Sequence, residues 1–418
     1  MWGILPHVNS KSGHKQKHLV LGVTGSIACY KAAELARFFM RRGFKVRVVM
    51  TKSATQFVSP LTFQALTGNP VAESFWDEGT RGNIGHIDLA DWADVVVIAP
   101  ATADCIAKMA FGFAESSLLA VVLATKAPVV IAPAMNVNML EHPRTQENLD
   151  LLRCRGVAIV QPEAGALACG WTGSGRLASA PEIYAQTERV LGPGDLVGKR
   201  VVISAGPTRE ALDPVRYLSN RSSGKMGVAL AREAYRRGAH VTLVHGPLGY
   251  KPVLPCEVVS RQTMTAEEMH QAVVHEVFDR GQSAQADIVI MAAAVADFRP
   301  THPGESKIKK SSAPSSIELT PNIDIVRDLG ERRGEKRRPY LVGFAVETDG
   351  EAALIREAQS KAVRKNVDII VGNLANDAFE GNTNRCWIVD AQGGSIALNT
   401  ASKRSIACSI WEEIVTRL

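Results

Sequence analysis

Short apolar runs alternate with helix-spaced segments along most of this chain. In the first half, residues 19–24 form an apolar run that stops at a glycine, residues 27–42 have helical spacing, and residues 45–50 are apolar again. A buried strand, a loop, a helix and a second buried strand are typical of the opening of a parallel α/β sheet. Similar runs predict three further strands, at residues 95–99, 129–132 and 157–160.

The same opening occurs again in the second half of the chain. The apolar run 201–204 precedes a glycine-rich stretch, residues 228–237 have helical spacing, and residues 240–244 form the next apolar run. Further buried strands are expected at residues 287–292, 340–344 and 368–372.

Leu-Gly-Pro-Gly-Asp at 191–195 is a cluster of helix and strand breakers, which favours a linker. We therefore predict two Rossmann-like, doubly wound α/β domains with mainly parallel sheets, at residues 18–190 and 196–418. A length of 418 residues agrees with two domains. Residues 299–316 are polar and rich in Pro, Ser and Lys, which favours a long mobile loop, typical of a lid or a connector.

Composition narrows the function classes. A net charge of +6 suits phosphate-bearing ligands, but the charges are scattered, which argues against nucleic-acid binding. Seven dispersed cysteines without a CxxC pair favour reduced thiols in the cytoplasm over disulfides or a zinc site. The polar residues 1–17 predict a frayed leader and no secretory signal. No apolar run approaches the roughly 18 residues that span a bilayer, so a soluble protein without membrane contact is expected.

Candidate ligand contacts in the first half lie where strands end. Gly25 and Ser26 stand between a strand and a helix, where unpaired N–H groups can bind a phosphate. An ordinary turn with a serine cap explains them equally well, and the spacing is not GxGxxG. Thr51, Ser53 and Thr102 follow two further strands. Ligands of open α/β sheets collect at these edges, which favours a phosphorylated cofactor.

Three residues could carry chemistry in this half. His86 precedes a helix, Asn136 lies in a proline-bounded loop, and Cys169 is surrounded by glycines. A lone histidine is more often a surface or capping residue, whereas a thiol in a glycine-rich loop is unusual for a structural cysteine. Residues 18–190 resemble the flavin-dependent cysteine decarboxylase family. The resemblance is carried by Gly-Ser-Ile-Ala at 25–28, His86, Ala-Pro-Ala-Thr at 99–102, Pro-Ala-Met-Asn at 133–136 with Met139, and Ala-Cys-Gly at 168–170.

The resemblance implies a flavodoxin-like flavoprotein domain that decarboxylates phosphopantothenoylcysteine with FMN. Oxidation of the CH2–SH group by FMN would supply a thiocarbonyl electron sink, CO2 would leave, and reduced flavin and a proton would restore the amine–thiol. It implies that His86 is the base, that Asn136 binds the substrate carboxylate and that Cys169 donates the proton. Met135 and Met139 are implied substrate contacts, and Leu140 replaces an aromatic residue that many members carry. The implied FMN contacts are Gly25, Ser26, Ile27, Thr51, Ser53, Ala101 and Thr102.

A second candidate site lies in the other half. Residues 219–227 open a helix with small polar residues, which favours phosphate contact, although a plain capped helix is the alternative. The spacing is not that of a Walker A loop. Lys307 begins a basic run in the expected mobile loop, where a solvated surface run is the alternative. Lys361 and Lys365 share one helix face and repel each other mildly unless an anion lies between them.

These residues resemble phosphopantothenate–cysteine ligases from about residue 196 to the C-terminus. The resemblance implies that the carboxylate of 4′-phosphopantothenate attacks the α-phosphate of CTP, with Mg2+ or Mn2+, and that cysteine then opens the acyl-cytidylate. Lys307 would stabilise the transition state, and Asn220 would contact the acyl-cytidylate. Asp297 would bind the metal or a hydroxyl group of the cytidylate. Ile323 stands where members usually have Pro, which loosens that turn. The other implied substrate contacts are Ala293, Ala294, Asn322, Asp324, Ile325, Phe344, Lys361 and Lys365.

Both resemblances in one chain imply a bifunctional enzyme of coenzyme A biosynthesis, because the product of the second half is the substrate of the first. The families also imply a homo-oligomer, with trimeric decarboxylase and dimeric ligase domains and a dodecamer as one closed form, so that His86 could serve a neighbouring subunit's flavin. A flavin-binding regulatory protein without activity is the alternative, but His86, Asn136 and Cys169 are all present. A nicotinamide dehydrogenase would need the missing GxGxxG.

Overall fold

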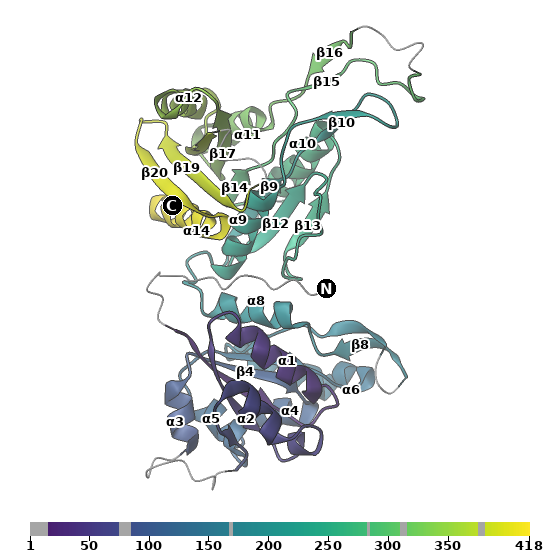
Figure 1. Cartoon of the computed structure of the whole chain (residues 1–418), viewed down its shortest axis with the longest axis vertical. Helices are drawn as coiled ribbons and strands as arrows, with labels where there is room; N and C mark the ends of the chain where they lie inside the picture. The colour runs from purple at the N-terminus through teal and green to yellow at the C-terminus, as the bar shows by residue number, and fades with distance from the viewer. Residues whose placement is uncertain (1–15, 75–84, 167–169, 282–284, 310–315, 375–380) are drawn as a thin grey trace. The chain divides into compact units, whose positions relative to one another are not determined.

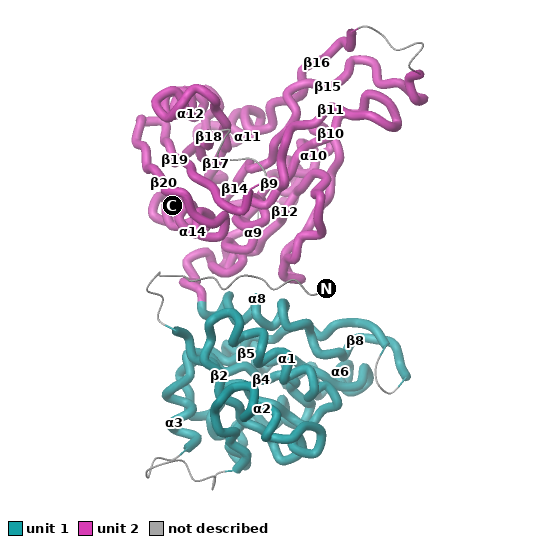
Figure 2. The backbone as a smooth tube through the Cα atoms, in the orientation of Figure 1, with its two compact units in different colours: residues 1–191 teal, residues 192–418 magenta. Residues whose placement is uncertain are grey.

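The chain folds into two compact units, Met1–Leu191 and Gly192–Leu418 (Figure 2). The division falls within the segment 191–195 that the sequence predicts as a linker. The computed structural model describes residues 16–74, 85–166, 170–281, 285–309, 316–374 and 381–418.

Unit 1 is built on a six-stranded sheet in which all neighbouring strands are parallel. The strand order is β3-β2-β1-β4-β5-β6. The predicted strand at 157–160 is shorter in the structure, where only two residues of it pair with β5. The strands are β1 (His18–Val23), β2 (Lys45–Met50), β3 (Val71–Ala72), β4 (Val95–Ala101), β5 (Val129–Pro133) and β6 (Ala158–Ile159).

Helices cover both faces of this sheet. Along β1, Leu19 and Leu21 belong to one core cluster, whereas Val20 belongs to the cluster on the opposite face. A strand buried on both faces gives the continuous apolar run seen in the sequence. The helices on the first face are α1 (Cys29–Met40), α2 (Pro60–Thr67) and α8 (Ala180–Val190), and those on the second are α3 (Gly85–Trp92), α4 (Ala103–Phe111), α5 (Ser117–Ala124) and α7 (Pro143–Cys154).

Three short elements complete unit 1. The 3-10 helix η1 (Ala54–Gln56) follows β2, and α6 (Val137–Glu141) follows β5. The strands β7 (Glu163–Ala166) and β8 (Thr172–Arg176) form an antiparallel pair that the apolar pattern does not reveal, because both strands are rich in small and polar residues.

Unit 2 contains an eight-stranded sheet in the order β13-β12-β9-β14-β17-β18-β19-β20. The first six strands in this order are parallel, and β19 and β20 add an antiparallel edge. The strands are β9 (Arg200–Ala205), β12 (His240–His245), β13 (Val259–Gln262), β14 (Ile288–Met291), β17 (Tyr340–Glu347), β18 (Ile369–Leu374), β19 (Thr383–Asp390) and β20 (Ser395–Ser402).

The helices of unit 2 pack on this sheet and on one another. Helix α9 packs on β9 and β12, and α14 packs against α9. Their contact includes a hydrogen bond in which the fully buried Trp411 indole donates to the Leu230 carbonyl at 3.0 Å. The helices are α9 (Lys225–Arg236), α10 (Ala266–Val274), the π-helix η2 (His275–Asp279), α11 (Ile325–Arg333), the 3-10 helix η5 (Gly334–Lys336), α12 (Glu351–Arg364) and α14 (Lys403–Arg417).

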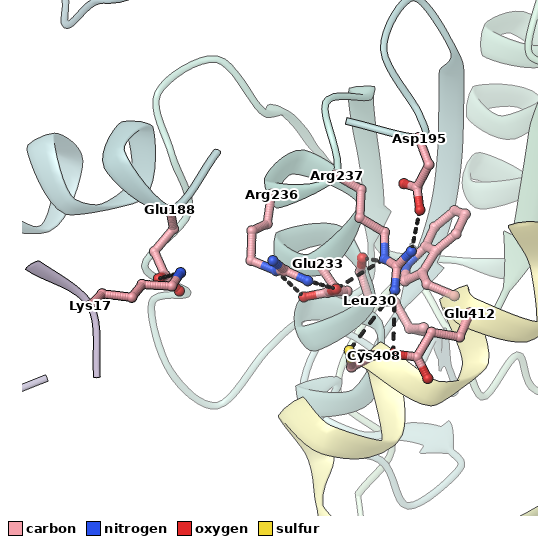
Figure 3. Close-up of polar contacts among 10 residues, drawn as sticks. Lys17, Glu188, Asp195, Leu230, Glu233, Arg236, Arg237, Cys408 and Glu412 are labelled. Atoms are coloured by element: carbon pink, nitrogen blue, oxygen red, sulfur yellow. Dashed lines mark hydrogen bonds and ion pairs between the residues drawn. The ribbon is translucent and has the colours of Figure 1, made fainter. Parts of the chain in front are cut away.

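A buried arginine fixes the first residues of unit 2 (Figure 3). Arg237, the C-cap of α9, donates to Asp195 Oδ2 at 2.6 Å and to Glu233 Oε1 at 3.0 Å. Its guanidinium also lies 3.9 Å from the sulfur of Cys408 on α14. Asp195, the last residue of the predicted linker, is therefore held by the core of unit 2. In unit 1, Lys17 lies 3.6 Å from Glu188 of α8.

Two antiparallel pairs extend away from the sheet of unit 2 (Figure 1). They are the hairpin β10 (Arg209–Ala211) with β11 (Tyr217–Ser219) and the pair β15 (Phe298–Pro300) with β16 (Leu319–Pro321). The sequence predicts a long loop over 299–316, but the structure places the start of this segment in β15. Residues 310–315 lie outside the described part of the chain. The sequence does not reveal the pair β15–β16, because each of its strands is only three residues long.

Numbered within each sheet, the six strands of unit 1 and the six parallel strands of unit 2 have the order 3-2-1-4-5-6 of Rossmann-type sheets, which confirms the doubly wound α/β class. Such sheets bind ligands outside the carboxyl ends of the strands, at the switch point between strands 1 and 4. The switch points here lie between β1 and β4 in unit 1 and between β9 and β14 in unit 2. Within the described residues, no helix is both long and apolar enough to cross a membrane.

Candidate functional sites

A buried threonine joins the two strands at the switch point of unit 1. Thr24 follows β1, and its hydroxyl donates to the carbonyl of Pro100 in β4 at 2.7 Å. The same hydroxyl accepts from the backbone N–H of Thr102 at 3.1 Å. The loops that follow β1 and β4 are therefore fixed to each other, and the exposed groups of both loops lie at the same edge of the sheet.

Gly25 allows a close approach between the loops after β1 and β2. A Cβ atom at Gly25 would lie 2.4 Å from Cβ of Ser53, so no larger residue fits without displacing that loop. The hydroxyl of Ser26 accepts from the N–H of Ala28 at 3.3 Å, as in an ordinary serine turn. No side chain caps α1, and two N–H groups of its first turn, those of Cys29 and Lys31, donate to the carbonyls of Ser26 and Ala28.

Two further predicted residues begin helices at this edge. Thr102 caps α4 by accepting from Cys105 N at 3.3 Å, and Asn136 caps α6 by accepting from Asn138 N at 2.9 Å. Met135 donates its N–H to the carbonyl of Gly175 in β8 at 3.0 Å. The hairpin β7–β8 is thereby attached to the loop that carries Asn136.

These loops surround a cavity of about 630 Å³. Two cations, Lys31 and Arg176, line it, and no carboxylate does among the described residues. Ile27, Tyr30 and Met139 each expose half or more of their surface beside it. The cavity therefore offers positive charge together with apolar surface. The predicted site residues that line it are Gly25, Ser26, Ile27, Thr102, Met135, Asn136 and Met139.

Other predicted residues do not line this cavity. Ala101 is buried at the end of β4, and Ser53 lies behind Gly25. Thr51 follows β2, and its hydroxyl accepts from Ala54 N at 3.3 Å. His86 is the second residue of α3, a helix that contributes nothing to the cavity. Cys169 lies outside the described residues, in the segment between β7 and β8.

Sequence reasoning missed Lys31 and Arg176. Lys31 lies on α1 six residues after Gly25, and a lysine near a helix start carries no signal by itself. Arg176 ends β8, a strand that the apolar pattern did not predict.

Hydrogen bonds hold the loop after β14 in unit 2. Ser204 accepts from Ala293 N at 3.1 Å, and Thr208 accepts from Ala296 N at 3.0 Å. The side-chain amide of Asn220 donates to Val295 O at 2.8 Å, and that of Asn322 donates to Ala296 O at 2.8 Å. The segment 293–297 is therefore a rigid wall at the switch point. Two predicted ligand residues, Asn220 and Asn322, hold it in place.

Two glycines bring the start of α9 close to the sheet. Gly224, with φ of 68°, is the N-cap, and a Cβ there would lie 2.3 Å from Leu248. A Cβ at Gly227 would lie 2.5 Å from Cβ of Ala205 in β9. Close helix–strand packing of this kind lets a ligand approach the first turn of the helix. The sequence placed the helix at 228–237, but it begins at Lys225.

A cavity of about 580 Å³ lies at this edge of the sheet. It takes residues from the loop between β11 and α9, from the loop after β14, from β17, and from α11 and α12. Ile325 reaches it from the core, since its residue is 3% exposed. The predicted residues that line it are Asn220, Ala293, Ala294, Asp297, Asn322, Ile323, Asp324, Ile325, Phe344, Lys361 and Lys365.

Lys307 is the one predicted residue of unit 2 that does not line this cavity. Its neighbour Ile308 donates its N–H to Asp213 Oδ2 at 3.2 Å and accepts from Arg216 Nη2 at 3.1 Å. Lys307 is thus attached to the β10–β11 hairpin. This hairpin and the pair β15–β16 with its connecting segment form the extension of unit 2.

The predicted lysines on α12 each have a carboxylate partner. Lys361 Nζ lies 2.7 Å from Glu347 Oε1, and Lys365 Nζ lies 2.8 Å from Asp324 Oδ2. Asp324 also caps α11 by accepting from Arg327 N. The repulsion expected between the two lysines is therefore relieved by protein carboxylates.

Three polar residues of this cavity were missed, because single lysines and asparagines have no pattern in the sequence. Among the described residues, no group of three or more His, Cys, Asp or Glu side chains could hold a metal ion by itself. The missed residues are Asn373, Asn384 and Lys403, whereas Lys225 belongs to the predicted segment 219–227.

Comparison with known proteins agrees with this two-part organisation. Residues 7–192 match the family model described as Flavoprotein, and residues 196–418 match that of the DNA/pantothenate metabolism flavoprotein C-terminal domain. The coenzyme A biosynthesis bifunctional protein CoaBC of Vibrio cholerae is 46% identical over 94% of this chain and 96% of its own length. The protein of the same name from Escherichia coli K12 is 42% identical over 96% of this chain and 97% of its own.

Among solved structures, the C-terminal domain of a CoaBC protein is 36% identical and covers 54% of this chain and 97% of its own, with a TM-score of 0.44. The relatives match both halves of the chain in a single protein. The chain therefore belongs to the family of bifunctional coenzyme A biosynthesis proteins, in which a flavoprotein domain is followed by a pantothenate-metabolism C-terminal domain.

Proposed function

We propose that the two units catalyse consecutive reactions. Unit 2 joins 4′-phosphopantothenate to cysteine through an acyl-cytidylate made from CTP, with release of pyrophosphate and CMP. Unit 1 then removes CO2 from the resulting 4′-phosphopantothenoylcysteine and yields 4′-phosphopantetheine. The observation that supports this assignment is the presence of two cavities at two switch points in a chain of this family.

FMN fits the cavity of unit 1. Positive charge from Lys31 and Arg176 and the positive dipole end of α1 suit its phosphate, and exposed Ile27 and Met139 suit an aromatic ring system. When bound, FMN supplies the two-electron oxidation of the substrate thiol and the later reduction that returns the product. Gly25 keeps the loop after β1 close enough to serve as part of the phosphate site.

The protein groups of unit 1 handle the substrate and its protons. The amide of Asn136, oriented by its cap hydrogen bond to Asn138, binds the substrate carboxylate until it leaves as CO2. His86 takes a proton in the oxidation, and Cys169 returns one to the enethiolate carbon in the final reduction. Because α3 contributes nothing to the cavity of its own unit, His86 serves the flavin of a neighbouring copy in a trimer.

The cavity of unit 2 suits a nucleotide and a divalent ion. The N–H groups of Ala293 and Ala294 are already bonded to Ser204 and Gly206, so these residues offer carbonyl oxygens, which accept from the amino group of a base such as cytosine. Asp297 supplies a carboxylate for Mg2+ or Mn2+. One carboxylate is sufficient, because Mg2+ commonly takes its other ligands from substrate phosphates and water.

Lys307 stabilises the charge that develops at the α-phosphate. Its place in the extension requires either that the extension closes over a cavity or that Lys307 reaches the cavity of a partner in a dimer. Trimeric units 1 and dimeric units 2 combine into a closed assembly such as a dodecamer. The protein works in the cytoplasm, in agreement with six free cysteines among the described residues.

One incubation tests the assignment. The purified chain receives 4′-phosphopantothenate, cysteine, CTP and Mg2+, and mass analysis should detect 4′-phosphopantetheine, CMP and pyrophosphate. Omission of CTP should abolish all three products. Addition of synthetic 4′-phosphopantothenoylcysteine without CTP should restore 4′-phosphopantetheine alone. A colourless protein that binds no added FMN would contradict the proposal. A protein that binds FMN but forms no product would favour the flavin-binding regulatory role.

A further inference from the structure

One end of the cavity in unit 2 contains a buried lysine without an anionic partner. Lys403 is the first residue of α14 and is only 8% exposed, yet it lines the cavity. No ion pair of its ammonium group exists among the described residues. Burial, together with the nearby charge of Lys225, holds the pKa of Lys403 below its usual range. A buried ammonium group is costly unless an anion accompanies it.

The second lysine at this end is Lys225, the first residue of α9. Its ammonium group donates to Asn382 Oδ1 at 2.9 Å, a neutral acceptor that leaves the positive charge uncompensated. Asn382 also accepts the backbone N–H of Lys403 through its carbonyl at 3.1 Å. One residue therefore connects the starts of α9 and α14, and both lysines stand at the same wall of the cavity.

An asparagine at this end has an unused acceptor. Asn384 is 3% exposed and lines the cavity, and its Oδ1 atom has no hydrogen-bond partner in the part of the chain that the structure describes. Its Nδ2 group donates to Asn373 Oδ1 at 3.4 Å. Buried polar atoms in native proteins are nearly always paired, so Asn384 is suited to a donor that a ligand brings.

The start of α9 adds to the positive potential. Its N-cap, Gly224, has no side chain that could accept from the first N–H groups. A twelve-residue helix directs its positive dipole end and these N–H groups to the same place. Lys361 and Lys365 differ from this pair, because Glu347 and Asp324 already neutralise them.

We propose that Lys403 and Lys225 form the phosphate subsite of unit 2, with Lys403 as a direct ligand of the phosphate and Asn384 as the acceptor for a neighbouring N–H or O–H of the same substrate. This inference rests on the proposed ligase function. Two substrates carry suitable chemistry, since CTP has a polyphosphate beside ribose hydroxyls and 4′-phosphopantothenate has a phosphomonoester beside a hydroxyl and an amide.

The test compares the full-length chain with Lys403→Met, Lys403→Arg and Lys225→Met. The control is Lys336→Gln, an exposed lysine of η5 outside the cavity. Pyrophosphate release gives kcat and the KM values for CTP and for 4′-phosphopantothenate. Decarboxylation of 4′-phosphopantothenoylcysteine checks that unit 1 is active in each variant. Thermal unfolding checks that the variant chain is folded.

Lys403→Met should raise the KM of one phosphate substrate at least about tenfold, since a charge-assisted hydrogen bond is lost. Its melting temperature should not fall, because the methionine removes a buried unpaired charge. Lys403→Arg should recover most of the affinity, and Lys336→Gln should stay within twofold of the parent. A change in the KM of CTP alone assigns the subsite to the polyphosphate, and a change in that of 4′-phosphopantothenate alone assigns it to the phosphomonoester.

Two results would overturn the subsite. One is an unchanged KM for both substrates in Lys403→Met and Lys225→Met. The other is a melting temperature that falls in Lys403→Met while KM stays within twofold, which indicates a structural lysine. If the parent chain releases no pyrophosphate from CTP, the proposed function fails by itself. Calorimetric titration with inorganic tripolyphosphate and with inorganic phosphate then tests the subsite, which is refuted if the parent and Lys403→Met bind both equally.

Discussion

Gly25 controls how closely the loops after β1 and β2 approach in unit 1. A Cβ atom at this position would meet the Cβ atom of Ser53 at 2.4 Å and its carbonyl carbon at 3.1 Å. The backbone of the second loop would have to move, which costs about 1–3 kcal/mol in a packed region. The close approach of the two loops at the edge of the cavity therefore requires that residue 25 has no Cβ atom.

We therefore expect Gly25→Ala to lower FMN affinity at least about tenfold with unit 1 still folded. Flavin fluorescence during titration of the apoprotein measures the dissociation constant, and circular dichroism checks the fold. Gly85→Ala is the matched control, because a Cβ there meets no atom of the described residues within 4 Å. Equal affinity of the two variants would show that the close approach is unimportant for the cofactor.

The cysteines differ strongly in their surroundings. Burial raises the pKa of Cys105 to about 12 and that of Cys386 to about 12, whereas Cys154 and Cys256 are exposed. A pKa near 12 leaves about one thiolate in ten thousand at pH 8. Only the thiolate attacks disulfide or iodoacetamide reagents.

At pH 8, Cys154 and Cys256 should therefore react with iodoacetamide long before Cys105 and Cys386. Peptide mass analysis of timed samples gives the rate at each position. In denaturant, all four should react at similar rates, which is the internal control. Fast labelling of Cys105 in the native protein would contradict the burial described for α4.

At the scale of elements, Asp213 joins the hairpin β10–β11 to the segment that carries Lys307. Its carboxylate accepts from the N–H groups of Val215, Arg216 and Ile308 and from the Arg216 guanidinium. The Arg216 guanidinium, first, and these N–H groups hold the pKa of Asp213 well below its usual range. The turn and the segment are therefore coupled through one carboxylate.

Asp213→Asn should loosen the extension and leave the sheet of unit 2 intact. Hydrogen exchange should accelerate in residues 209–219 and 304–309 but not in β9 or β14, and the exposed Asp279→Asn should change neither. Since the folded pKa is depressed, the stabilisation is complete above the unfolded value of about 4 and is lost as the pH falls through the folded value. The parent extension should therefore exchange equally at pH 5 and pH 7 after correction for intrinsic rates, and faster exchange at pH 5 would contradict this pH range.

The sequence predicts elements well where apolar runs exist and poorly where they do not. The strands β1 and β4 follow from apolar runs whose two faces are buried, and β2 follows from Val46 and the apolar residues 48–50. The strands β7 and β8 consist of small or polar residues, and β15 and β16 are only three residues long, so only the folded chain reveals these pairs. Motif residues at strand ends meet in the cavities because strand order brings these ends together. Lys403 could not be foreseen, because its role depends on where α14 begins.

At the scale of the whole molecule, the two units contain separate machinery for consecutive steps. Cys169→Ser should leave pyrophosphate release by unit 2 unchanged and permit CO2 loss, yet stop at an oxidised enethiol product. Asn220→Ala should abolish ligation, since Asn220 holds the wall at Val295, and should still decarboxylate added 4′-phosphopantothenoylcysteine. A mixture of the two variants should form 4′-phosphopantetheine. Full product from Cys169→Ser alone would refute the proton-donor role.

The repeated 3-2-1-4-5-6 order has a consequence for inhibitor chemistry. Both cavities present a helix start and lysine or arginine side chains to a ligand. Compounds that combine a flat heterocycle with an anionic group are therefore expected to bind to either cavity. Discrimination must come from what differs, namely the thioether-lined rim at Met135 and Met139 on one side and the amide-rich floor at Asn373 and Asn384 on the other.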